Sequence, residues 1–421
     1  MPNNVLYAQS GGVTAVINAS ACGVIQTARA LPETFGKVYA GKDGILGVLH
    51  EELIDLEQES EETIAGLRHT PGGAFGSCRF DLGDPDTHPE QYQRLVEVFR
   101  AHDIGYFFYN GGGGSMDTAL KVARIADEMG YPIVSVGVPK TIDNDLACTD
   151  TSPGFGSAAK FIATVVREAS MDVESMASSS TKVFIMEVMG RHAGWLAAAA
   201  ALAQQSKDSP PMLILFAEIP FDQADFLRRL NDVIATHGYC VVVASEGLKG
   251  PDGKLLTVAQ SHDVYAYTQL GGVAPMLAGM IKEKTGHKIH WAVADYIQRS
   301  ARHIAARVDV EQAYATGAMA VRFAAEGHTG FMPVIRRLCD APYLWTVDRV
   351  PLEQVANIEQ GMPRDFISEG GYGITEACRR YLRPLIEGEA YPPYEGGLPR
   401  YVRIRGELLE KKLPAFELNK G

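Results

Sequence analysis

The chain has 421 residues, of which 46% are hydrophobic and 21% charged, and this length predicts more than one lobe of an ordinary globular protein. A formal net charge of −12 without a basic run argues against nucleic-acid binding, and no segment approaches the roughly 18 apolar residues of a membrane span. The six cysteines form no CxxC pair and the N-terminus shows no signal-peptide pattern, so we expect reduced thiols and a cytoplasmic location.

Short apolar runs alternate with longer amphipathic ones along the first 245 residues. Strands are expected at residues 5–9, 104–109, 133–138, 182–188, 212–218 and 240–245. Helices are expected at residues 13–28, 115–129, 155–176, 192–204 and 222–237. The alternation predicts an α/β fold with two Rossmann-like lobes, whose mainly parallel sheets are flanked by helices, and a C-terminal extension.

Polar or glycine-rich turns follow five of the expected strands. They occupy residues 9–12, 110–115, 139–145, 189–191 and 245–247. Ligands of parallel α/β sheets bind beyond the carboxyl ends of the strands. We therefore expect these turns to surround a single site.

Two of the turns have the composition of phosphate-binding loops. Ser10-Gly11-Gly12 opens a helix, where backbone N–H groups can approach an anion. Residues 111–114 are four consecutive glycines, which cost backbone entropy unless the loop needs unusual dihedral angles or close approach to a ligand. The simpler alternative is a pair of ordinary tight turns.

The segment PKTIDND at residues 139–145 carries the clearest chemistry. Asp143 can act as a general base, Lys140 can neutralise phosphate, and Asp145 can bind a metal or orient an arginine. The alternative is a solvated acidic loop. Arg191, which ends the segment EVMGR, is either a fixed guanidinium facing phosphoryl oxygens or a surface ion-pair partner.

These segments resemble the phosphofructokinase family, and specifically its pyrophosphate-dependent branch. The resemblance spans residues 10 to 299 and rests on these segments in the family's order: SGG at 10–12, GGAFGSCRF at 72–80, GGGGS at 111–115, PKTIDND, EVMGR, SEG at 245–247 and IQR at 297–299. It implies reversible phosphoryl transfer from pyrophosphate to the 1-hydroxyl of fructose 6-phosphate, with Mg²⁺. A homodimer or homotetramer is expected as well.

The resemblance also implies the division of the chain. Residues 1–150, completed by about 300–341, form the expected lobe for the phosphoryl donor. Residues 151–299 form the lobe for the sugar phosphate. Residues 342–421 form the extension.

Residue roles follow from the matched motifs. The catalytic residues are expected to be Asp143, Lys140 and Arg191, with Asp143 as the base for the sugar hydroxyl. The donor-binding residues are Gly11, Gly12, Arg79, Phe80, Gly112, Gly113, Gly114, Ser115 and Lys140. The substrate-binding residues are Thr141, Asp143, Lys182, Met189, Gly190, Arg191, Glu246, His290, Tyr296 and Arg299. Lys182 and His290 match cations that reach across from a neighbouring subunit. The metal-ligand candidates are Asp143, Asp145 and Asp117.

Two positions give opposite indications about the donor. ATP-using members typically have glycine where this chain has Lys140, which favours pyrophosphate. Pyrophosphate users carry an aspartate at the position of Gly114 that obstructs a nucleotide's inner phosphate, so Gly114 would admit ATP. The remaining alternatives are therefore an ATP-dependent phosphofructokinase and a non-catalytic sugar-phosphate-binding or regulatory subunit.

Overall fold

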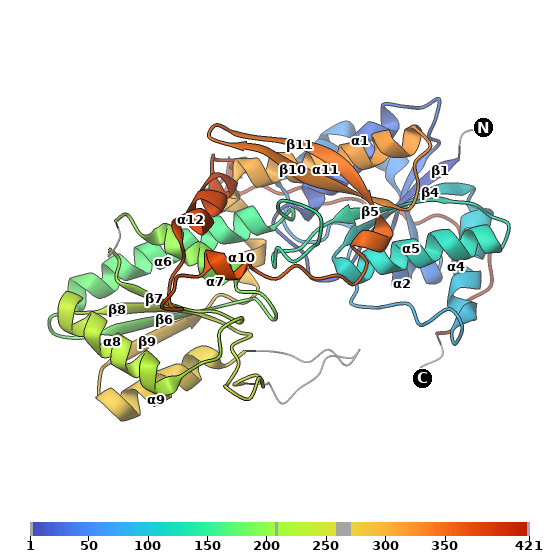
Figure 1. Cartoon of the computed structure of the whole chain (residues 1–421). Helices are drawn as coiled ribbons and strands as arrows, with labels where there is room; N and C mark the ends of the chain where they lie inside the picture. Colours follow the sequence, from blue (N-terminus) through green and yellow to red (C-terminus); the bar gives the residue numbers. More distant parts are fainter. Residues whose placement is uncertain (1–2, 207–208, 258–270, 419–421) are drawn as a thin grey trace.

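The computed structural model describes residues 3–206, 209–257 and 271–418. Figure 1 shows two α/β lobes, each built around its own sheet, with segments of the C-terminal part running over both. Within the described part, no helix is both long and apolar enough to cross a membrane. The predicted α/β class and the two sheets flanked by helices are confirmed.

The sheet of the first lobe has seven strands in the order β11-β10-β5-β4-β1-β2-β3. Its central strands run parallel, whereas β3 and β11 pair antiparallel at the two edges. The strands are β1 (Asn4–Gln9), β2 (Val38–Gly41), β3 (Leu53–Asp55), β4 (Ile104–Gly111), β5 (Val134–Pro139), β10 (Phe331–Asp340) and β11 (Tyr343–Pro351).

Alternating side chains of these central strands enter two separate cores. On β1, Val5 and Tyr7 pack with α1 (Ile17–Arg29) and α11 (Arg307–Ala325), whereas Leu6 and Ala8 pack with helices on the opposite face. The helices of that face are α2 (Ile45–Leu49), α4 (Pro89–Ala101) and α5 (Gly113–Glu128), and Figure 1 shows them below the sheet. Because helices cover both faces of the sheet, the central strands are continuous runs of apolar residues.

The sheet of the second lobe has four parallel strands in the order β7-β8-β6-β9. They are β6 (Val183–Val188), β7 (Met212–Leu215), β8 (Cys240–Ser245) and β9 (Ile289–Val293). One face packs against α6 (Phe155–Met176) and α7 (Trp195–Ala199), and the other packs against α8 (Gln223–His237) and α9 (Val273–Thr285). The shorter helices are α3 (Glu61–Gly66), α10 (Ile297–Ser300) and α12 (Glu376–Leu382).

Most of the predicted elements lie within a few residues of the observed ones. The helix expected from residue 13 begins only at Ile17, because residues 10–14 form the turn after β1. The helix expected at 192–204 is limited to α7 and a 3-10 turn over Ala200–Ala203. The strand expected at 212–218 ends at Leu215, where the chain turns.

The C-terminal third pairs more extensively with the sheet of the first lobe than the sequence suggested. The expected boundary between residues 341 and 342 falls inside the β10–β11 hairpin, so the sheet of the first lobe extends to Pro351. Further on, Ile54 of β3 forms a bridge with Leu408, and the Leu409 amide donates to the Leu53 carbonyl at 2.8 Å. The chain after α12 therefore returns to the first lobe and covers its β3 edge.

Candidate active site

A cavity of about 410 Å³ lies where the carboxyl ends of β1, β4, β5, β6 and β8 meet. Its lining includes these predicted residues: Gly11, Gly12, Arg79, Phe80, Gly112, Gly113, Gly114, Ser115, Lys140, Thr141, Asp143, Asp145, Met189, Arg191, Glu246 and Arg299. Larger surface hollows of about 840 and 950 Å³ contain none of the predicted site residues. The strand-end turns thus converge on one site, as the sequence predicted.

Two arginines lie against the first glycine turn. A Cβ atom on Gly12 would collide with the Arg299 guanidinium and would lie 3.4 Å from Nη2 of Arg79. A side chain at this position would therefore displace the Arg299 guanidinium from the glycine turn. The Arg299 guanidinium also stacks on the Tyr296 ring, with its carbon 3.7 Å from the ring centroid. Two positive groups are thus held beside backbone that can bind phosphate.

The second glycine turn is the start of α5. Gly112 is the N-cap residue, no side chain caps this end, and the helix continues for 16 residues. The uncapped end gives a positive partial charge and backbone N–H groups at the cavity, which suits a phosphate. The Asn357 amide donates to the Gly113 carbonyl at 3.2 Å and so fixes the loop from the C-terminal part of the chain.

Lys140 is a buried cation, with only 4% of its surface exposed. Burial, followed by repulsion from Arg299, lowers the pKa of its ammonium group to about 8, while Asp143 opposes the change. A Cβ on Gly11 would lie 3.4 Å from its Nζ atom, so Lys140 reaches the first glycine turn. A cation that is this poorly solvated gains strongly from a bound anion.

Asp143 and Asp145 project from the same turn into the cavity wall. The Asp143 amide donates to Thr141 Oγ1 at 3.0 Å, which shapes the turn. Burial raises the pKa of Asp143, and the charges of Lys140 and Arg191 oppose this rise. Burial, followed by repulsion from Asp143, raises the pKa of Asp145 to about 6. A carboxylate whose pKa is raised by burial is suited to accepting a proton.

The opposite wall comes from the ends of β6 and β8. Glu246 accepts from the Gly190 amide at 3.4 Å, and burial, followed by repulsion from Asp143, raises the pKa of Glu246 to about 7. Gly190 has a φ angle of +138°, and a Cβ there would lie 2.5 Å from the Ala193 carbonyl oxygen, so only glycine fits. This wall offers a carboxylate for hydroxyl groups and a backbone that a ligand can approach closely.

Comparison with known proteins identifies the family. The family described as Phosphofructokinase matches residues 4–324, which is more than half of the chain. The chain belongs to the phosphofructokinase family. A pyrophosphate–fructose 6-phosphate 1-phosphotransferase of Halomonas elongata is 59% identical over 416 residues, covering 99% of each chain.

Two solved structures of the phosphofructokinase family are similar over nearly the whole chain. Both are described as pyrophosphate-dependent phosphofructokinases. The structure from Nitrosospira multiformis has a TM-score of 0.92 and 55% identity, and covers 99% of this chain and 100% of its own. The structure from Marinobacter aquaeolei has a TM-score of 0.91 and 57% identity, with the same coverage.

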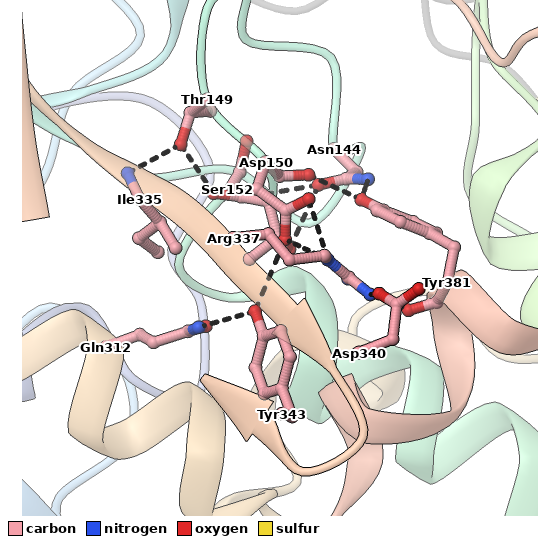
Figure 2. Close-up of polar contacts among 11 residues, drawn as sticks. Asn144, Thr149, Asp150, Ser152, Gln312, Ile335, Arg337, Asp340, Tyr343 and Tyr381 are labelled. Atoms are coloured by element: carbon pink, nitrogen blue, oxygen red, sulfur yellow. Dashed lines mark hydrogen bonds and ion pairs between the residues drawn. The ribbon is translucent and has the colours of Figure 1, made fainter. Parts of the chain in front are cut away.

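The turn that carries Asp143 and Asp145 is held in place by a network of hydrogen bonds and ion pairs around Asn144, which Figure 2 shows. Asn144 has a left-handed φ of +54°, and its side-chain oxygen accepts from the Ser152 amide at 2.9 Å. Its Nδ2 donates to the Tyr381 hydroxyl at 2.9 Å, and that hydroxyl donates to the Asp150 carbonyl at 2.6 Å. Asp150 in turn pairs with Arg337 of β10 at 3.0 Å. The position of the turn therefore depends on β10 and α12.

The residues near the cavity that sequence reasoning missed include four with polar side chains. Asp81, His192 and Glu359 line it, and Asn357 contacts the glycine loop. His192 Nδ1 lies 2.7 Å from a Glu359 carboxylate oxygen, and the Gln360 amide donates to the Asp145 carbonyl at 2.7 Å. Asp81 follows the matched GGAFGSCRF segment directly and could have been found. Residues 357–360 follow the last strand of the first lobe without any recognisable pattern.

Several predicted residues lie outside the cavity lining. Gly190 is adjacent to it, Tyr296 contacts Arg299, and Lys182 donates to the Ala177 carbonyl. His290 lies exposed on β9, at the edge of the second sheet. Asp117 faces along α5 and pairs with Lys121 at 2.7 Å. Asp117 is thus one turn inside the helix and outside the lining of the cavity, whereas the other two metal-ligand candidates, Asp143 and Asp145, line it.

The carboxylates of the cavity fit a metal ion whose ligands come mainly from the phosphoryl donor. Asp81, Asp143 and Asp145 all line it, yet the described residues contain no group of three or more His, Cys, Asp or Glu side chains suited to holding a metal ion. Mg²⁺ usually takes only one or two carboxylates and completes its shell with phosphate oxygens and water. The cavity therefore suits a divalent metal ion that enters with a phosphate ligand.

Proposed function

We propose that the protein transfers a phosphoryl group reversibly from pyrophosphate to the 1-hydroxyl of fructose 6-phosphate, giving fructose 1,6-bisphosphate and phosphate in glycolysis or gluconeogenesis. The observation that carries the proposal is the placement of Asp143. It lies in one cavity with Lys140 and the start of α5 on the donor side, and with Glu246 and Arg299 on the sugar side. The names of relatives that match nearly the full chain agree with this reaction.

On the donor side, the residues bind and neutralise pyrophosphate. The first-turn amides of α5 and the turn at Gly11 and Gly12 bind phosphoryl oxygens, and Arg79 and Lys140 supply positive charge. Charge builds up on the transferring and leaving groups in phosphoryl transfer, so positioning and electrostatic stabilisation account for most of the catalysis.

On the acceptor side, Asp143 removes the proton from the 1-hydroxyl as that oxygen attacks phosphorus. Burial has already raised the pKa of Asp143, which strengthens it as a base. Glu246 accepts hydrogen bonds from sugar hydroxyls, Arg299 binds the 6-phosphate, and Arg191 stabilises the charge that develops near Asp143. Thr141, Met189 and Gly190 complete the wall around the sugar.

We propose Mg²⁺ as the divalent metal of this site, with Asp143 and Asp145 as the candidate protein ligands. When bound, it would supply positive charge to the phosphoryl oxygens. These two carboxylates would hold it directly or through water molecules.

The ATP-dependent alternative has one specific observation in its favour, namely the open space at Gly114. A Cβ there would meet only Asp81 and Asn357, at 3.6 and 3.9 Å. The buried Lys140 and the names of the relatives favour pyrophosphate. The two donors can be distinguished directly by assay.

We also propose self-association as a homodimer or homotetramer, in which Lys182 and His290 complete the site of a neighbouring copy. Exposed apolar side chains near His290 support this, with Trp291 48% and Ile297 60% exposed. A cytoplasmic location is proposed because all six cysteines are free thiols.

The proposed function is tested by assaying the purified protein with fructose 6-phosphate and Mg²⁺, supplying either pyrophosphate or ATP and measuring fructose 1,6-bisphosphate. Turnover with pyrophosphate is expected. Turnover with ATP alone would replace the proposal by the ATP-dependent reaction. Binding of fructose 6-phosphate without turnover from either donor would indicate the non-catalytic subunit.

A further inference from the structure

A buried group of polar side chains lies directly behind the two glycine turns. Gln9 precedes the turn at residues 10–12, Asn110 precedes the glycine loop, and the two residues are paired neighbours on β1 and β4. Both side chains are fully buried. The hydroxyl of Tyr7, also on β1, accepts hydrogen bonds from Nδ2 of Asn110 at 2.8 Å and from Nε2 of Gln9 at 3.3 Å. One hydroxyl thus joins the residues from which both turns begin.

The same group of side chains holds a third segment of the donor side. Nε2 of Gln9 also donates to Oδ1 of Asn18 at 3.1 Å, and this oxygen accepts from the Ala74 amide at 3.0 Å. A Cβ on Gly73 would lie 2.9 Å from Oε1 of Gln9, so the backbone there packs directly against the Gln9 amide. Both contacts fall in the segment at residues 72–80, which carries a predicted donor cation.

These side chains act where the ladder between β1 and β4 ends. The last backbone bond joins the Ser10 amide to the Asn110 carbonyl at 2.8 Å, and beyond it the two turns separate around the cavity. The partners of the Tyr7 hydroxyl lie in the first lobe, behind the cavity lining, whereas the sugar side comes from β6 and β8. A displacement of about 1 Å in a binding group can slow a reaction roughly 100-fold.

We propose that Tyr7 is a positioning residue for the phosphoryl donor, because its hydroxyl fixes the spacing of the turn at residues 10–12, the glycine loop and the segment at 72–80. The N–H groups and cations of these three segments then meet the donor phosphates without rearrangement, which lowers the cost of binding. Buried polar networks of this kind hold backbone segments in one arrangement when their members are connected. This inference rests on the proposed function and names a residue that supports donor binding from outside the cavity.

The test compares Tyr7→Phe with Tyr131→Phe as the matched control. Both substitutions remove a hydroxyl that has two hydrogen-bond partners in the first lobe. The Tyr131 hydroxyl, however, is bonded to the carbonyls of Phe99 and Ile104, at the amino end of β4 and away from the turns. Calorimetry measures the dissociation constants of magnesium pyrophosphate and fructose 6-phosphate. Steady-state kinetics gives kcat and both KM values, and a thermal melt gives the stability.

Tyr7→Phe is expected to raise the dissociation constant and the KM of pyrophosphate by about tenfold, the size of one or two ordinary hydrogen bonds, and to change the affinity for fructose 6-phosphate by less than about twofold. Tyr131→Phe should lower the melting temperature to a similar extent and leave both affinities unchanged. General destabilisation would not produce this difference between the two substrates.

Asn110→Ala provides a second measurement, because it removes the donor of the shorter bond to Tyr7. It should weaken pyrophosphate binding selectively as well, and it repeats the comparison if Tyr7→Phe does not fold. Since the two residues act through one hydrogen bond, the fold-loss of donor affinity in the double variant should be smaller than the product of the two single losses.

Unchanged affinity for pyrophosphate in Tyr7→Phe, or equal losses for pyrophosphate and fructose 6-phosphate, would overturn the inference. An unaltered protein that does not use pyrophosphate would contradict the proposed function instead. The same comparison made with magnesium ATP would then decide the role of Tyr7, because either donor places its phosphates on these turns.

Discussion

The side-chain amide of Asn144 donates a hydrogen bond to the hydroxyl of Tyr381 at 2.9 Å and thereby connects the catalytic turn to α12, 237 residues later in the chain. Asn144 lies between the two aspartates of PKTIDND and has a left-handed backbone, so its contacts determine where both carboxylates point. The Tyr381 hydroxyl also donates to the Asp150 carbonyl. A residue of the C-terminal third thus positions the proposed base although it does not itself line the cavity.

We expect Tyr381→Phe to lower kcat by about tenfold, since it removes both hydrogen bonds and leaves the Asn144 amide with one partner fewer, at a cost of roughly 0.5–1.5 kcal/mol for each bond. The KM for fructose 6-phosphate should change less than kcat, because Glu246 and Arg299 remain in place. Steady-state kinetics and a thermal melt measure both effects. The control is Tyr391→Phe, a change at a tyrosine that is 62% exposed. Equal losses of kcat in the two variants would show that Tyr381 has no positioning role.

Asp143→Asn should lower kcat by roughly 10²–10⁴-fold, the usual effect of losing a general base. The amide keeps the size of the carboxylate, so the fold should be retained, and removing a poorly solvated charge should not lower the melting temperature. Fructose 6-phosphate binding, measured by calorimetry, is expected to persist. Near-normal turnover in this variant would contradict the assignment of Asp143 as the base.

The pKa of Lys140 predicts that the enzyme uses its phosphoryl donor less efficiently at alkaline pH. Its ammonium group is charged below a pH of about 8 and loses the charge as the pH rises through that value. The groups that act on it are the cations Arg299 and Arg79, and the carboxylates Asp143 and Asp145. The kcat/KM for pyrophosphate should therefore fall above a pH of about 8.

Lys140→Arg is the control for this limit, because a guanidinium stays charged throughout the range. The variant should be slower at neutral pH, since the longer planar group does not fit the buried position equally well. Its pH profile should nevertheless lack the alkaline fall. If both proteins lose activity at the same pH, the titrating group is the pyrophosphate complex or another side chain, and Lys140 does not set the limit.

Most of the cavity could be predicted from the sequence, because most of its lining comes from short segments that are adjacent in the chain to predicted strands. Five of the segments that line it directly follow apolar strands, so the order of strands and turns was enough to bring Gly12, Lys140 and Glu246 together. Contacts made over long separations were not predictable in this way. Glu359 and Tyr381 reach the catalytic turn only because the β10–β11 hairpin adds to the first sheet and brings the following chain back across both lobes. The helical spacing of Cys378, Tyr381 and Leu382 predicts a buried helix face, but it does not indicate which part of the chain that face packs against.

The exposed edge of the second sheet leads to a prediction about assembly. β9 forms that edge, and its residue Trp291 is 48% exposed, while the neighbouring Tyr296 and Ile297 are 61% and 60% exposed. Large apolar side chains gathered at a sheet edge are typical of an interface between protein chains. His290 lies on the same strand, so a second copy packed here would bring its own His290 close to this surface.

Trp291→Asp should therefore reduce the mass measured by light scattering after gel filtration to that of a smaller assembly or a monomer, because a buried, unpaired charge at an interface is strongly unfavourable. The same variant should lose turnover together with its assembly, since Lys182 and His290 are proposed to complete a neighbour's site. Leu398→Asp is the matched control, at a leucine that is 72% exposed on β13 (Leu398–Pro399), which belongs to a separate two-stranded sheet. Full activity in a monomeric Trp291→Asp protein would show that each chain carries a complete site of its own. An unchanged mass in that variant would instead place the interface elsewhere on the molecule.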